Sequence, residues 1–126
     1  MQIRRRTSKR SQLGRNTLNA YAAGLLDGEG CVRWNNSPSI EVSNKHRGAL
    51  RLLQEKWGGT IRDKGDEVFV WTVYGKKALK YLSNVAKYSV IKYPQIVALF
   101  RAVSSKGTVR QQHIDTLKRL KNVYTN

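Results

Sequence analysis

The sequence has few acidic residues, few histidines and a single cysteine. Only 8 of its 126 residues are Asp or Glu, against 24 Lys or Arg, which gives a formal net charge of +16 at pH 7. A balance this one-sided indicates a polyanionic partner, most simply a nucleic acid. Cys31 has no second cysteine for an internal disulfide, and with only His46 and His113 beside it a Cys/His zinc site is not expected. The same shortage argues against nucleases that need a histidine-rich metal site.

Long apolar segments are also missing. No run approaches the roughly 18 apolar residues that a membrane-spanning helix needs, and we expect no membrane partner. The first residues, MQIRRRTSKR, lack the apolar stretch of a secretory signal, so we expect an intracellular protein. They are rich in Arg and free of acids, as organelle transit peptides are. The compartment therefore stays open between an organelle, a phage-infected cell and a prokaryotic cell.

The first 16 residues are strongly basic. Residues 1–16 hold six Lys or Arg and no acid, with few apolar side chains. This composition predicts a flexible arm that becomes ordered on DNA, ahead of a single domain over residues 17–126. A solubilising tail is the alternative interpretation of such a charge run.

The next segment predicts a helix with a smooth face. Residues 17–29, TLNAYAAGLLDGE, read as a helix with Asn16 or Thr17 as the N-cap. Small residues recur every four positions and share one side of this helix: Ala20, Gly24 and Gly28. Such a face allows a second helix to approach backbone to backbone.

An antiparallel hairpin follows. Apolar residues alternate with polar ones through Val32 and Trp34, and again through Ile40 and Val42 after a turn at residues 35–38. Period-two alternation with one apolar face predicts a half-buried antiparallel sheet. Its polar face carries hydrogen-bonding side chains suited to the edges of DNA bases.

The rest of the chain predicts one more helix and hairpin, and then helices only. The expected elements are a helix over residues 47–57, a hairpin over 60–73 that turns at Lys64-Gly65, and helices over 76–88, 94–103 and from a capping box at Thr108 onward. Both faces of the returning strand of the hairpin are apolar, so the pattern leaves its facing undetermined. The order is α-ββ-α-ββ-α-α-α, an α+β fold without an internal repeat.

Two of the few acids, Asp27 and Glu29, stand together at the end of the first helix. The helix dipole disfavours negative charge at a C-terminus, so a carboxylate there gains from a bound hard cation such as Mg²⁺. One Glu per chain makes a poor metal site. If the helix pairs with its symmetry mate through the smooth face, two Glu29 carboxylates come together. The smooth face and the acids therefore support one hypothesis, a metal site that forms only in the dimer. A plain cap or turn is the alternative for such an acid pair.

Residues 22–30, AAGLLDGEG, resemble the LAGLIDADG motif of homing endonucleases. Seven of the nine positions are the same or closely similar, and the departures are Ala22 for Leu and Gly28 for Ala. Asn44 falls where the family places a polar residue at the end of its second strand, and Lys92 falls where it places an active-site lysine three residues before a Gln. The resemblance covers roughly residues 17–103. A single motif copy is similar to the homodimeric branch of the family.

The resemblance implies specific roles. Glu29 and the Gly28 carbonyl would hold Mg²⁺ or Mn²⁺, Lys92 would stabilise charge at the scissile phosphate, and Asn44 would position water. Asp27 resembles the first acid of the motif, for which we expect a structural hydrogen-bonding role. The implied dimer interface consists of Ala20, Ala23, Gly24 and Asp27.

The fold that the resemblance implies is an antiparallel, saddle-shaped sheet over the major groove of double-stranded DNA, with extra C-terminal helices. Its candidate DNA-contacting residues are Arg33, Asn35, Glu41, Ser43, Arg62 and Lys64. Two-fold symmetry implies a long pseudo-palindromic target. Members of the family are typically encoded within introns or inteins and cut the allele that lacks them.

Two other functions fit the same residues. One is a non-cleaving relative, either a maturase that binds RNA or a DNA-binding regulator. The other is a generic basic nucleic-acid-binding module with an accidental motif, which needs no dimer. A heterodimer with another single-motif chain also stays open.

Overall fold

The computed structural model describes residues 14–123, which form an α+β fold in the predicted order. The elements are α1 (Arg15–Glu29), β1 (Gly30–Trp34), β2 (Pro38–Asn44), α2 (Arg47–Trp57), β3 (Thr60–Gly65), β4 (Val68–Tyr74), α3 (Gly75–Val85), the 3-10 helix η2 (Ala86–Tyr88), α4 (Tyr93–Val103) and α5 (Gly107–Val123). Helix α2 has the predicted bounds. No helix of the described part of the chain is long and apolar enough to cross a membrane.

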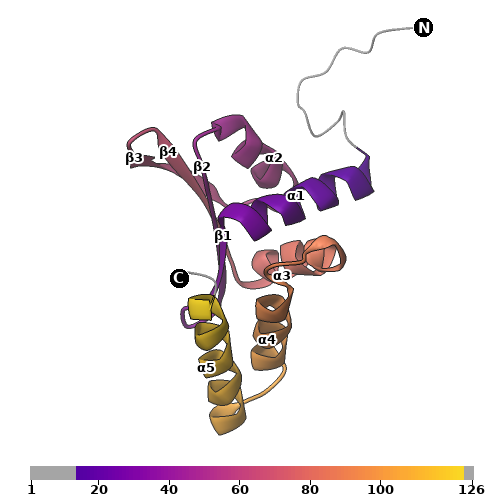
Figure 1. The fold of residues 1–126 in the computed structure, drawn as a ribbon, viewed down its shortest axis with the longest axis vertical. Helices are drawn as coiled ribbons and strands as arrows, with labels where there is room; N and C mark the ends of the chain where they lie inside the picture. Colours follow the sequence, from indigo (N-terminus) through magenta and orange to yellow (C-terminus); the bar gives the residue numbers. More distant parts are fainter. Residues whose placement is uncertain (1–13, 124–126) are drawn as a thin grey trace, which may run out of the picture.

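The four strands form one antiparallel sheet in the order β1-β2-β4-β3. Val42 lies opposite Trp71, which lies opposite Ile61, and alternation turns these side chains toward the helices. This register settles the facing of β4, which the sequence pattern left undetermined. Helices α1, α2 and α3 all lie on one side of the sheet (Figure 1). Among the described residues, no helix lies across the other side of the sheet, here called the open face (Figure 1).

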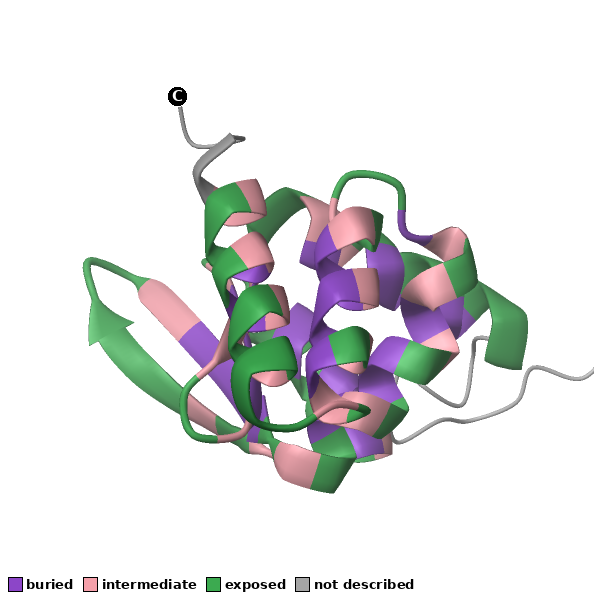
Figure 2. Cartoon of the chain, turned by 90° about the horizontal axis from the view of Figure 1, so that it is seen from below, coloured by how far each residue is buried: buried purple, intermediate pink, exposed green. Residues whose placement is uncertain are grey.

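The core fills the space between the sheet and the helices, where the buried segments gather (Figure 2). Its centre is Tyr81, whose ring makes edge contacts with Trp57 and Trp71 at centroid distances of 4.9 and 5.1 Å. The Tyr81 hydroxyl donates to the carbonyl of Ala22 at 3.0 Å. This hydrogen bond satisfies the buried hydroxyl group of Tyr81 and connects α3 to α1.

Helices α4 and α5 pack side by side, and both contact β1 (Figure 1). Pro94 stands in the first turn of α4, as the sequence predicts. The guanidinium of Arg110 on α5 lies 5.2 Å from the centre of the Trp34 ring on β1. Helix α5 therefore lies beside the sheet edge that β1 forms.

Three predicted helix ends are wrong. Helix α1 begins at Arg15 rather than residue 17, because the Gly14 carbonyl accepts the first helical bond from Leu18 N at 2.9 Å. Its N-cap is Gly14, not Asn16 or Thr17. The predicted arm lies mainly outside the described residues, and its last two positions belong to α1. Helix α3 ends at Val85, with a 3-10 turn continuing to Tyr88. Thr108 lies inside α5, which begins at Gly107.

The second hairpin turns later than predicted. The strands pair as far as Gly65 and Val68, and the turn is formed by Asp66 and Glu67, both with positive φ. A register shift between Asp63 and Gly65 places Lys64 at a bulge. Lys64-Gly65 is a stronger turn signal in the sequence than Asp66-Glu67, because it contains glycine. In the structure Gly65 instead accommodates the bulge, with a φ of 96°.

Candidate active site and nucleic-acid interface

The outer side of α1 is smooth and exposed. Ala20, Gly24 and Gly28 are all exposed, and a Cβ added at either glycine would meet no heavy atom of the described chain within 4 Å. Ala23 is fully buried, because it lies on the side of α1 that faces the core with Leu26. Its placement in an exposed dimer interface is therefore wrong. Tyr21, which is 42% exposed, borders the smooth face instead.

Asp27 is used within its own chain. Its carboxylate accepts hydrogen bonds from Ser89 Oγ at 2.5 Å, from Val90 N at 2.7 Å and from Lys92 N at 3.0 Å. Burial raises the pKa of Asp27, but these hydrogen bonds outweigh burial and hold the pKa below its ordinary value. The carboxylate thus joins the segment after η2 to the end of α1, which agrees with the predicted hydrogen-bonding role.

Lys92 lies at the C-terminal end of α1. Its Nζ atom donates to the main-chain carbonyl of Asp27 at 3.2 Å, and its own N–H binds the Asp27 side chain. An ammonium group there complements the negative end of the helix dipole. Residues 65 positions apart in the sequence are thereby brought into one site.

Glu29 ends α1 with an exposed side chain. Within residues 14–123 its carboxylate has no hydrogen bond or ion pair. Glu29 lines a hollow together with Ser43, Asn44, Lys45 and Val68, at the top of the sheet where β2 ends. Asn44 Oδ1 accepts the main-chain N–H of His46 at 2.8 Å, which fixes the amide beside this hollow.

His46 has a structural task. Its Nδ1 atom accepts the main-chain N–H of Ala49 at 3.1 Å and so caps α2. A ring nitrogen engaged in this way is not free to act as a ligand or a base. Ser43, Asn44 and Lys45, which precede this histidine in the chain, supply the polar side chains that line the Glu29 hollow.

The donor chemistry at the end of α1 fits a hard divalent cation. The Glu29 carboxylate and the Gly28 carbonyl are both oxygen donors, and the last carbonyls of a helix lack partners within it. No three His, Cys, Asp or Glu side chains gather into a metal-binding group in the described part of the chain. One chain supplies one free carboxylate here, so further ligands must come from outside it.

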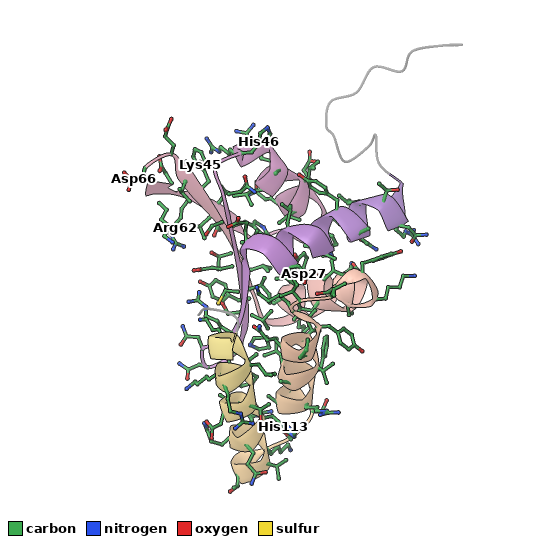
Figure 3. All side chains as sticks on the ribbon, viewed as in Figure 1. Asp27, Lys45, His46, Arg62, Asp66 and His113 are labelled. Carbon is green, nitrogen blue, oxygen red and sulfur yellow. The ribbon has the colours of Figure 1, made fainter. Side chains whose placement is uncertain are left out.

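Four of the predicted DNA-contacting residues share the open face. The strand register turns four side chains away from the helices: Arg33 on β1, Glu41 and Ser43 on β2, and Arg62 on β3. Arg62 extends away from the helices (Figure 3). Asn35 lies beyond the end of β1.

Sequence reasoning missed a contribution from α5. Lys118 and Lys121 line a hollow with Arg33 and Trp34, between α5 and β1. Two lysines three positions apart on a predicted helix share a side, which is a readable signal. Nothing in the pattern indicated that α5 lies beside β1, so the sequence could not place these lysines next to Arg33.

No protein-family model matches the sequence, and no curated protein matches it. Several solved structures do match this chain. The homing endonuclease I-CvuI, in complex with its target in the presence of 2 mM Ca, aligns over 89% of this chain and 85% of its own, with a TM-score of 0.71 and 17% identity. The archaeal intron-encoded homing endonuclease I-Vdi141I, complexed with DNA, aligns over 83% and 80%, with a TM-score of 0.58 and 17% identity.

A third match is the LAGLIDADG homing endonuclease I-SmaMI bound to cleaved DNA, with a TM-score of 0.58 and 21% identity. It covers 82% of this chain, whereas this chain covers 42% of I-SmaMI. At these identities the matches define the fold. The chain has the fold of the LAGLIDADG homing endonucleases, which confirms at the level of the fold the resemblance carried by residues 22–30.

Proposed function

We propose that this protein is a site-specific homing endonuclease that makes metal-dependent double-strand cuts in DNA as a homodimer. The position of Glu29 carries the proposal. Its carboxylate is exposed, has no partner within residues 14–123, and ends a helix whose outer side is smooth. A free acid at the negative end of a helix is unfavourable by itself and favourable with a cation.

Pairing through α1 explains why the site is incomplete in one chain. Two α1 helices in contact at Gly24 and Gly28 would bring the two Glu29 side chains to the same end of the interface. A two-fold dimer would read a pseudo-palindromic site.

The open face and its flank are suited to duplex DNA. Arg33 and Arg62 present guanidinium groups there, and Arg is the residue best shaped to read guanine in the major groove. Lys118 and Lys121 on α5 extend this surface past the β1 edge, where they would contact phosphates. The net charge of +16 favours rapid, salt-sensitive association.

The chemistry would be hydrolysis of a phosphodiester in each strand. Glu29 and the Gly28 carbonyl would hold Mg²⁺ or Mn²⁺, which would supply an activated water and stabilise charge at the phosphate. I-CvuI structures were obtained with Ca or with Mg present. Lys92 would place its ammonium beside the same phosphate, and Asn44 would orient water in the Glu29 hollow.

The test compares the wild type with Glu29→Gln on a library of randomised duplex sites with Mg²⁺. We expect the wild type to cut both strands at a near-palindromic site, and the variant to bind that site without cutting it. Glu55→Gln, which removes an exposed acid from α2, is the matched control and should cut normally. Binding without cutting by the wild type would instead favour the DNA-binding regulator, and preferential binding of structured RNA the maturase.

A further inference from the structure

An acidic residue stands in the middle of the surface that would face DNA. Glu41 lies halfway along the inner strand β2 and turns to the open face. In a protein with a net charge of +16, a carboxylate at this place opposes the approach of a phosphate backbone. Its presence there needs a local reason, and its contacts supply one.

Glu41 lies between two arginines that come from different strands. Its Oε2 atom lies 2.8 Å from Arg33 Nη2, which is a close ion pair. The same oxygen lies 3.8 Å from Arg62 Nη2, an ionic contact longer than a hydrogen bond. One carboxylate oxygen thus joins β1 to β3 across two intervening strands.

The geometry also fixes which donors Arg33 presents. Its Nε atom is buried and has no hydrogen-bond partner among the described residues. Only the Nη end of Arg33 is therefore left for an outside partner, and Glu41 already sets its direction. Arg62 is more open, with 58% of its side chain exposed against 24% for Glu41. The carboxylate lies lower on the face than this arginine, where it can direct the guanidinium without covering it.

We infer that Glu41 is a positioning residue for DNA sequence recognition, acting through Arg33 and Arg62. This rests on the proposed DNA-binding function. Two free guanidinium groups would repel each other and turn toward phosphates, which lie on either side of any groove. Held by one carboxylate, they point at the groove floor, where an Nη end can donate to guanine O6 and N7. The residue therefore weakens binding to DNA in general and strengthens the preference for the target.

The experiment measures Kd and its salt dependence for Glu41→Gln on two duplexes. One is the site selected from a randomised library, and the other is a scrambled duplex of the same length and composition. We expect the variant to bind the scrambled duplex more tightly, with a salt slope steeper by about 1 per chain. The ratio of target to scrambled affinity should fall about 10-fold or more, since an ordered bidentate contact contributes that much discrimination.

Two controls separate positioning from plain charge removal. Glu55→Gln removes the same charge from α2, and it should leave the affinity ratio unchanged. In an Arg33→Gln/Arg62→Gln background, Glu41→Gln should have no further effect on the ratio, because its partners are gone. Circular dichroism of each variant checks that the fold is retained.

Other outcomes overturn the inference. Equal tightening on both duplexes by Glu41→Gln would mean that the carboxylate acts only as a repelling charge. Glu41→Gln could instead lose the preference for a single C·G pair of the target, both in the wild type and in the Arg33→Gln/Arg62→Gln background. That result would mean that Glu41 accepts a hydrogen bond from cytosine N4 directly. A wild type that binds neither duplex overturns the proposed function itself, and this inference with it.

Discussion

Replacing Gly24 by Leu separates the stability of the single chain from the stability of the dimer. Gly24 lies on the exposed side of α1, and a Cβ built on it meets no heavy atom of the described chain within 4 Å. A Cβ there displaces no atom of the described chain, and a longer side chain on this exposed side of α1 would extend into solvent. In the proposed dimer the same position faces its symmetry mate.

The two effects have opposite signs. Within one chain, exchanging Gly for Leu in a helix interior adds about 0.5–1 kcal/mol of helix stability. Across a close helix pair, inserted side chains cost about 1–3 kcal/mol each, and two-fold symmetry inserts two of them. The expected penalty on the dimer is about 2–6 kcal/mol, which raises its dissociation constant by about 30-fold to 10⁴-fold. Gly24→Ala should lie between wild type and Gly24→Leu.

Sedimentation equilibrium measures the dissociation constant of the dimer. Thermal unfolding, at a concentration where the variant is monomeric, measures the stability of the single chain. Gln112→Leu places the same apolar side chain at an exposed position on α5 and serves as the control. A Gly24→Leu protein that dimerises as tightly as the wild type would refute the α1 interface. A wild type that stays monomeric with and without DNA would refute the homodimer.

Three further outcomes are expected. Asp27→Asn should lower the free energy of unfolding at pH 7 by about 1–2 kcal/mol, because an amide accepts fewer of the three donors at a partly exposed site. Since the folded-state pKa of Asp27 lies below the ordinary 3.8, this difference should shrink as the pH falls below 3.8, which urea titrations at pH 7 and pH 3 would detect. Lys92→Met should slow single-turnover cleavage about 10²-fold or more while the Kd for DNA changes little; an equal change in both would make Lys92 a binding residue. Lys118→Gln/Lys121→Gln should reduce the slope of log K against log salt by about 2, whereas an unchanged slope would place α5 away from DNA.

Much of the fold could be predicted because the local patterns agree with the global arrangement. Alternation through Ile40 and Val42 is matched by cross-strand partners in β4, so the predicted facing of the first hairpin is confirmed. Helix α2 begins after a capping residue and ends at Trp57, just before Gly58, whose φ is 79°. Prediction errors occurred where one residue type can serve two different backbone conformations. The sequence predicts a turn at Gly65, but the positive φ of this residue forms part of a bulge.

The site was only half predictable. Glu29 could be singled out because an acid at a helix C-terminus is unusual in a chain with so few acids. The contact between Lys92 and the Asp27 carbonyl could not be derived from the spacing, because it joins residues 65 positions apart. Ala23 was misplaced for a different reason: small residues occur on both sides of α1, and size alone does not tell an exposed side from one packed on the core.

The two acids of the motif show why adjacent residues of the same charge can have different roles. Both lie at the negative end of α1, where each is disfavoured by the dipole. Asp27 overcomes this within its own chain, since hydrogen bonds from Ser89, Val90 and Lys92 stabilise its ionised form. Glu29, one methylene longer and the last residue of α1, has no such donor within residues 14–123. The first acid therefore stabilises the end of the helix, and the second keeps an exposed charge that the proposed divalent cation would balance.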